Sequence, residues 1–264
     1  MTDADPPLRA ITLDFGNTLV PVDRAALSAV VLATAEAAVA TLGPFDLDAF
    51  LAAWADERDR QFRDDVPQFR EVDLGERAIR VLARLRGLRP PPPDEPWDQA
   101  DAATRSTPEE IAWLIDAYSG AFIEAIPAPA RIQAVLERLA AGHDLAILSN
   151  WPLAATIDRY AEAAGWMPFL RAIVVSQRVG TIKPQPAIFE AARAQLGGPP
   201  PRAVLHVGDD WQADVVGAAG AGWRVAYVRG RPHDSPLPSS DRDGSVVPDY
   251  EIDEVDELVS LLGA

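Results

Sequence analysis

Short apolar segments that alternate with helical segments are the feature of this 264-residue chain that most restricts its fold. The apolar segments are rich in Val, Ile and Leu on both faces, which is typical of strands in a parallel sheet covered by helices. Glycine stands just past the intervening helical segments, where helices commonly end. The pattern predicts an α/β domain with a doubly wound parallel sheet. The predicted strands are residues 9–15, 143–150, 171–176, 202–209 and 223–230, and the predicted helices are 128–142, 153–165, 186–198 and 212–222.

A long helical segment interrupts this alternation directly after the first strand. It carries four helical patterns without a convincing strand, and its proline-rich stretch, residues 88–98, predicts a stiff loop. We therefore predict two domains, an α/β core of residues 1–20 and 127–264 and an α-helical domain of residues 21–126. The four predicted helices of the inserted domain are residues 23–42, 46–64, 73–87 and 108–124.

The composition of the chain excludes several classes of function. The absence of cysteine excludes disulfides, thiolate metal sites and a thiol nucleophile. The formal net charge of -16 repels phosphate backbones, so we expect no nucleic-acid partner. We find no apolar run of the ~18 residues that a membrane span needs, and the N-terminal residues lack the apolar centre of a signal peptide. We therefore expect a cytoplasmic protein without a membrane partner, and its oligomeric state stays open.

Polar side chains with complementary chemistry follow four of the predicted strands. Ligands bind at the carboxyl ends of the strands in open α/β sheets, so these side chains are expected to meet. Each of them alone is most often a helix cap, a turn residue or a solvated charge, and only their joint occurrence indicates a site. In strand order the side chains are Asp14 with Asn17 and Thr18, then Ser149 with Asn150, then Lys183, then Asp209 with Asp210 and Asp214.

Together these residue types suit phosphoryl transfer. Carboxylates and a backbone carbonyl form an oxygen-rich site of the kind that Mg2+ prefers. An ammonium and a hydroxyl can hold the remaining phosphoryl oxygens, while one carboxylate attacks phosphorus and forms an acyl phosphate. Lys183 adds weight because it is the only lysine in a chain that otherwise uses arginine, and lysine offers a compact point charge.

Four motifs resemble those of the haloacid dehalogenase superfamily of hydrolases, in the subgroup with an α-helical cap inserted after the first motif. The resemblance implies a Rossmann-like core with five central parallel strands. It also implies Mg2+-dependent hydrolysis of a small phosphorylated molecule through an aspartyl-phosphate intermediate. The motifs are DFGNTL (14–19), LAILSN (145–150), GTIKPQPAIF (180–189) and VGDDWQADVVGAAGAGW (207–223).

The resemblance also implies a role for each matching residue. Asp14 would be the nucleophile and a Mg2+ ligand, and Gly16 would offer its backbone carbonyl to the metal. Asp209 would be a further ligand, and Asp214 would support the metal directly or through water. Phosphoryl binding would fall to Thr18, Ser149, Asn150 and Lys183, of which Ser149 and Lys183 are also counted as catalytic.

Gly16 departs from the pattern of the phosphatases in this superfamily. They resemble one another in having a second aspartate at this position, which protonates the leaving group and later activates water. Four interpretations remain open: a substrate whose leaving group needs no proton, another acid such as Asp210 or a cap residue, a 2-haloacid dehalogenase, or a protein that binds a phosphorylated ligand without turnover. Family phosphonatases also lack the aspartate, but they use a cap lysine, and residues 21–126 contain none.

Candidates for substrate recognition outside the motifs are weaker. The cap arginines Arg58, Arg60, Arg63 and Arg70 are expected to be solvated, although one of them could bind a substrate anion. Trp54 and His206 are expected to be core residues, and Trp151 suits a pocket wall or a packing role equally well.

Overall fold

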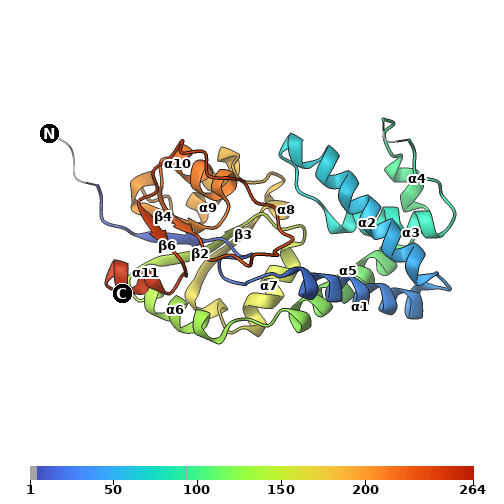
Figure 1. Cartoon of the computed structure of the whole chain (residues 1–264), viewed down its shortest axis with the longest axis horizontal. Helices are drawn as coiled ribbons and strands as arrows, with labels where there is room; N and C mark the ends of the chain where they lie inside the picture. The colour runs from blue at the N-terminus through green and yellow to red at the C-terminus, as the bar shows by residue number, and fades with distance from the viewer. Residues whose placement is uncertain (1–4, 93) are drawn as a thin grey trace. The chain divides into compact units, whose positions relative to one another are not determined.

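The computed structural model describes residues 5–92 and 94–264, which form two compact units (Figure 1). One unit comprises the chain up to Arg24 together with Ile126–Ala264, and the other is Ala25–Ala125. The α/β unit holds every strand, and the second unit is helical.

The α/β unit is built on one parallel sheet of six strands in the order β3-β2-β1-β4-β5-β6, which confirms the predicted fold class. β1 lies between β2 and β4, so that Leu13 stands beside Ile147 and Val207. The strand order reverses direction at β1 and β4, and this switch point is where ligands bind in such sheets. The strands are β1 (Ala10–Leu13), β2 (Asp144–Ser149), β3 (Leu170–Val175), β4 (Val204–Gly208), β5 (Arg224–Val228) and β6 (Tyr250–Ile252).

Helices cover both faces of the sheet, with α9 and α10 on one face and α6, α7 and α11 on the other (Figure 1). A buried apolar cluster joins the first face to its helices and includes Phe189, Trp211 and Trp223. Gly165 and Gly197 follow α7 and α9 with φ angles of 71° and 83°, which glycine adopts without steric cost. The helices are α6 (Ala130–Ala140), α7 (Ala154–Ala163), α8 (Ser176–Val179), α9 (Pro186–Gln195), α10 (Gly217–Gly220) and α11 (Glu257–Leu262).

The predicted helix over residues 212–222 is present, but its first half is not a regular α-helix. Residues Trp211–Val216 form a π-helix, η4, and only then does α10 begin. The widened turn arises because the Asp210 carbonyl accepts from both Asp214 N (3.0 Å) and Val215 N (3.3 Å). π-helical turns of this kind are frequent at functional sites, and this one carries Asp214.

The helical unit has its own core. The Trp54 ring stacks between Phe50 and Tyr118 at centroid distances of 5.8 and 5.7 Å, and the buried Arg77 lies over the same ring. Trp54 is therefore a packing residue. The helices are α1 (Arg24–Leu42), α2 (Leu47–Asp64), α3 (Leu74–Leu85), α4 (Gln99–Ala103) and α5 (Pro108–Ala125), of which the five-residue α4 is absent from the sequence prediction.

Helix α1 corrects the expectation about membrane-spanning length. Among the described helices it is, taken singly, the one that is long and apolar enough to cross a bilayer by length and composition. Its buried positions are Val30, Thr34, Ala35 and Ala38, which share one stripe of the helix. Helices of soluble proteins meet the same criterion, so α1 by itself assigns no membrane location.

The four arginines of the helical unit considered above all form ion pairs with carboxylates of the same unit. Arg58 pairs with Asp59, Arg63 with Asp64, and Arg70 with Asp65. Arg60 contacts Glu57 at 2.9 Å and Glu76 at 3.2 Å. These pairs give no support to an anion-binding role for the four arginines.

The ion pair between Arg86 and Glu110 joins α3 to α5 and makes the stability of the helical unit depend on pH. Two guanidinium nitrogens donate to the two Glu110 oxygens at 2.6 and 2.8 Å. This hydrogen bonding lowers the pKa of Glu110 to about 2. A lowered carboxyl pKa stabilises the folded state above the unfolded pKa of about 4.3, and the effect is lost as the pH falls towards 2.

We therefore expect Glu110→Gln to destabilise the protein at neutral pH by about 1–2 kcal/mol, because the pair is only partly buried. The difference from wild type should shrink steadily on acidification, as measured by urea unfolding at a series of pH values. Glu124→Gln, an exposed change on the same helix, serves as the matched control. A Glu110→Gln deficit that is the same at all pH values would contradict this assignment.

Candidate active site

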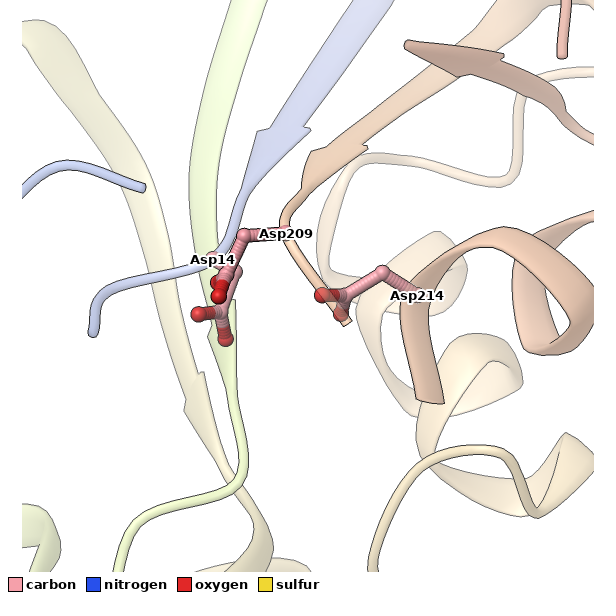
Figure 2. Close-up of side chains that lie close together, drawn as sticks. All are labelled: Asp14, Asp209 and Asp214. Atoms are coloured by element: carbon pink, nitrogen blue, oxygen red, sulfur yellow. The ribbon is translucent and has the colours of Figure 1, made fainter. Parts of the chain in front are cut away.

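Three carboxylates from separate parts of the chain converge at the switch point of the sheet (Figure 2). Asp14 follows β1, Asp209 follows β4, and Asp214 projects from η4. All three are buried, and each offers one oxygen that lies within 4.8 Å of the other two. The structure thus brings together the carboxylates that the strand-end argument selected.

Lys183 lies at the centre of this cluster and is only 2% exposed. Its Nζ donates to Asp14 Oδ1 at 2.7 Å, to Asp214 Oδ1 at 2.6 Å and to the Leu148 carbonyl at 2.9 Å. Asn150 holds the lysine backbone from both sides, since its amide nitrogen donates to Lys183 O and its amide oxygen accepts from Lys183 N. Both ends of the Asn150 amide are therefore engaged in placing the lysine.

Burial and the surrounding charges set the protonation of these groups. Burial raises the pKa of Asp14 to about 6 against the opposing effect of Lys183. Burial also raises the pKa of Asp209 to about 8, and the charges of Asp14 and Asp214 act in the same direction. Asp214 is equally buried, but Lys183 and His206 outweigh the burial and hold the pKa of Asp214 below its usual value. Asp14 and Asp209 therefore both favour a further positive charge in the cluster.

His206 is a buried core residue of β4 and contacts the Asp214 carboxylate of the cluster. Burial lowers the pKa of His206, which favours the neutral ring. Its Nδ1 lies 2.8 Å from the hydroxyl of Thr12, its register partner on β1, and its Nε2 lies 3.0 Å from Asp214 Oδ1. A ring that accepts at Nδ1 and donates from Nε2 satisfies both contacts and fixes the orientation of Asp214.

Gly208 lets Asp214 approach the end of β4. A Cβ atom on Gly208 would lie 2.2 Å from Asp214 Cγ, far inside any tolerable contact. The backbone N–H of Asp210 donates to the second Asp214 oxygen at 2.9 Å. A residue without a side chain is therefore required one position before Asp209.

The turn after β1 presents the remaining first-motif residues. Asn17 takes a left-handed conformation (φ 59°), which asparagine tolerates better than most residues. Its side-chain oxygen accepts from Val22 N at 3.2 Å, which closes the turn. Thr18 Oγ1 donates to Asp209 Oδ1 at 3.3 Å, and Phe15 anchors the turn in the core with no exposed surface.

Ser149 ends β2 beside the nucleophile candidate. Its hydroxyl lies close enough to Asp14 to favour ionisation of that carboxyl, so that it contributes to lowering the Asp14 pKa. The buried Ser149 Oγ satisfies no hydrogen bond of good geometry within residues 5–92 and 94–264. An orphaned hydroxyl of this kind is available to a ligand.

The space beside Gly16 is filled by apolar side chains. A Cβ atom on Gly16 would lie 2.5 Å from Leu237 Cδ1 and 3.3 Å from Trp151 Cζ3. Trp151 is buried and packs edge-on against Phe15, which agrees with the packing role of the two that the sequence left open. Asp210, considered as a substitute acid, is occupied as a helix cap that accepts from Ala213 N at 2.7 Å.

Two residues near the site are absent from the sequence prediction. Arg231 Nη1 lies 3.2 Å from Asp209 Oδ2, and Leu237 lies on Gly16. Arg231 comes three residues after the end of β5, so an extension of the strand-end argument to the fifth strand could have found it. Leu237 has no local signal, because it lies in the middle of an irregular loop.

Comparison with known proteins places this site in a family. A model of haloacid dehalogenase-like hydrolases matches residues 8–222. The chain is 37% identical over 94 residues to a glyceraldehyde 3-phosphate phosphatase of Methanopyrus kandleri, a match that covers 36% of this chain and 39% of the relative. It is 30% identical over 158 residues to a ribulose-1,5-bisphosphate 5-phosphatase of Halopiger xanaduensis, which covers 59% and 65%, respectively.

These sequence matches span less than two thirds of either relative. Similarity of fold to solved structures covers nearly the whole chain. A 2-haloacid dehalogenase of Pseudomonas syringae pv. Tomato DC3000 superposes with a TM-score of 0.69 over 97% of this chain and 98% of that chain, at 20% identity. The likeness to that enzyme concerns the fold alone. Because the family model spans most of the sequence and the sheet has the same architecture, the chain belongs to the haloacid dehalogenase-like hydrolases.

Proposed function

We propose that this hydrolase is a Mg2+-dependent phosphatase that acts on a small phosphorylated molecule through an aspartyl phosphate at Asp14. The observation that carries the proposal is the buried arrangement of Lys183 between Asp14 and Asp214, with Asp209 alongside. An attacking carboxylate, an ammonium and two further carboxylates serve phosphoryl transfer, where charge on the phosphoryl oxygens must be neutralised. The phosphatases named above among the relatives support this choice.

The carboxylate cluster fits a divalent cation with a preference for oxygen. Asp14, Asp209 and Asp214 each supply one oxygen at a mutual spacing that a single ion can bridge. Burial raises the pKa of Asp14 and of Asp209, so an added cation relieves an electrostatic cost. We propose that these three side chains and the Gly16 carbonyl hold Mg2+. When bound, Mg2+ would neutralise charge on the phosphoryl oxygens.

The protein's own residues then have distinct tasks. Asp14 attacks phosphorus with a carboxylate oxygen that Lys183 orients. The orphaned Ser149 hydroxyl and the Lys183 ammonium bind phosphoryl oxygens. Thr18 acts at the Asp209 carboxylate, and Asn150 acts by holding the lysine backbone. We propose Asn150 as a positioning residue rather than a direct ligand of the phosphoryl group.

The helical unit Ala25–Ala125 is proposed to be the cap that selects the substrate. In the sequence it is inserted into the α/β unit after the first-motif turn. The substrate is proposed to be small and phosphorylated, and the location cytoplasmic.

A 2-haloacid dehalogenase is the second candidate, and Gly16 is the observation that favours it. A halide leaves without a proton, so such an enzyme needs no acid at this position. Family dehalogenases, however, lack the carboxylate pair that this chain keeps in Asp209 and Asp214. The candidate therefore ranks below a phosphatase.

The test measures phosphate release from acetyl phosphate and p-nitrophenyl phosphate, and chloride release from 2-chloropropionate, each with Mg2+ and with chelator. We expect phosphate release that requires Mg2+ and returns when Mg2+ is restored. Asp209→Asn should weaken Mg2+ binding in calorimetry, because it removes a charged ligand, with Asp158→Asn, which breaks an ion pair with Arg178 outside the cluster, as the control. Chloride release that is insensitive to chelator, without phosphate release, would favour the dehalogenase.

A further inference from the structure

The loop between β5 and β6 passes over the end of the first strand, and we call its residues 231–240 the strap. It is held by specific contacts at both ends. Arg231 contacts Asp209 at 3.2 Å and donates from Nη2 to the Leu237 carbonyl at 3.0 Å. At the other end, Ser240 Oγ donates to Asp210 Oδ1 at 2.8 Å.

The middle of the strap is fixed against the turn that follows β1. Ser235 Oγ donates to Asn17 Oδ1 at 3.1 Å, and Leu237 N donates to the same hydroxyl at 3.4 Å. These contacts place the Leu237 side chain on Gly16, next to Trp151. The apolar cover over Gly16 is therefore a built feature of the α/β unit.

The apolar cover lies at the position from which phosphatases of this superfamily protonate the leaving group. Phosphatases of this superfamily resemble one another in having an aspartate at the position of Gly16. That aspartate protonates the leaving group and later activates water. In this chain, a Cβ atom at position 16 would lie 2.5 Å from Leu237 Cδ1. Apolar atoms therefore stand beside Gly16 in place of a proton donor, and the Asp210 carboxylate is engaged by Ala213 N and Ser240.

We propose that Gly16, whose side-chain space Leu237 and Trp151 fill, is the specificity-determining position that restricts the enzyme to phosphate compounds whose leaving group departs as a stable anion, namely acyl phosphates and aryl phosphates. The inference rests on the proposed function and names its substrate class. In the first step an Asp14 oxygen bonds to phosphorus, and the bond from phosphorus to the leaving-group oxygen breaks. The electron pair leaves with that oxygen as an unprotonated carboxylate or phenolate, which balances the charge.

The missing side chain at Gly16 also affects the second step, the hydrolysis of the aspartyl phosphate. Water attacks phosphorus, the bond to Asp14 breaks, and the products are the Asp14 carboxylate and dihydrogen phosphate, which takes both protons of the water. A good leaving group assists only the first step, because the second step is the same for every substrate. The aspartyl phosphate therefore accumulates, and its hydrolysis limits turnover.

The experiment uses the full chain with Mg2+ and a series of aryl phosphates whose phenols differ in pKa. For wild type, kcat/KM should fall about tenfold for each unit by which the phenol pKa rises, since no acid assists departure of the phenolate. The value of kcat should be the same for all substrates that saturate the enzyme. Rapid mixing should show a burst of one phenol per active site, followed by slower steady turnover.

Variants at Gly16 and Leu237 test whether the missing acid and the side chain that fills its space cause the dependence on phenol pKa. Gly16→Asp with Leu237→Ala supplies an acid and the space for it, so kcat/KM for the poorest leaving groups should rise about 100- to 10,000-fold and the series should flatten. Gly16→Asp alone should gain less, because Leu237 occupies the space of the new side chain. Leu237→Ala alone, the matched control, adds no acid and should keep the steep series.

The failures of the two proposals are distinguishable. If wild type releases phosphate from the series with little dependence on phenol pKa, a proton donor is present and the inference about Gly16 is overturned, while the phosphatase proposal stands. A double variant as steep as wild type would also overturn it. If no aryl phosphate and no acetyl phosphate is hydrolysed, the phosphatase proposal itself fails.

Discussion

Replacement of Asp14 by asparagine should lower Mg2+-dependent phosphate release by at least about 10,000-fold, because the substitution removes the nucleophile while it keeps the shape of the side chain. The measurement is steady-state release from acetyl phosphate. The phenol burst from an aryl phosphate should disappear with it. Asp14→Ala should behave identically, which guards against deamidation of the new asparagine back to aspartate.

Stability distinguishes loss of chemistry from loss of structure in this variant. The pKa of Asp14 is raised in the folded protein, so its ionised form costs stability above its unfolded pKa of about 3.9. Asp14→Asn should therefore melt no lower than wild type in the presence of chelator. An Asp14→Asn protein that is fully folded and still releases phosphate at a tenth of the wild-type rate would remove Asp14 from the mechanism.

Lys183→Met should abolish activity and destabilise the folded protein by about 3–5 kcal/mol near neutral pH. The lysine is 2% exposed and contacts two buried carboxylates, and removal of one member of a buried charged group leaves the others uncompensated. Lys183 also holds down the pKa of Asp214, so that pKa should rise in the variant. The stability deficit should accordingly widen as the pH rises from about 5 to about 8, when the unpaired carboxyls ionise.

Urea unfolding followed by tryptophan fluorescence and by circular dichroism measures this deficit. Arg193→Met, which breaks an exposed pair with Glu190, is the matched control and should cost less than about 1 kcal/mol at any pH. Lys183→Arg keeps the charge but replaces a point charge by a planar fork. It should recover part of the stability and little of the activity. A Lys183→Met protein as stable as wild type at neutral pH would contradict the central role given to this ion pair.

Much of the architecture was predictable from local pattern. Runs of Val, Ile and Leu on both faces can be buried only in a covered parallel sheet, so the five central strands and the flanking helices follow from the sequence. The clustering of Asp14, Lys183, Asp209 and Asp214 was predictable for a similar reason. Asp14 and Asp209 follow strands, Lys183 lies in the loop before α9, and Asp214 lies in η4. Parallel strands end at the same edge of the sheet.

Features that depend on long-range contacts were not predictable. The π-helical turn that carries Asp214 depends on the Asp210 carbonyl, and it differs from a regular helix by one hydrogen-bond step that no periodicity reveals. Asn150 reads as a ligand in the sequence, yet its amide lies against the backbone of a residue 33 positions away. The role of His206 beside Asp214 was hidden because a buried histidine on a strand reads as an ordinary core residue.

The chemical class of the protein was thus determined by the sequence itself, since residue types at strand ends specify which groups can meet. The surroundings of Gly16 were decided by the tertiary structure alone. The sequence reveals that an acid is missing there, but the atoms that fill its place belong to Leu237, 221 positions further along the chain. Such a contact depends on the path of an irregular loop, which is fixed by Arg231, Ser235 and Ser240 and by no pattern within the loop.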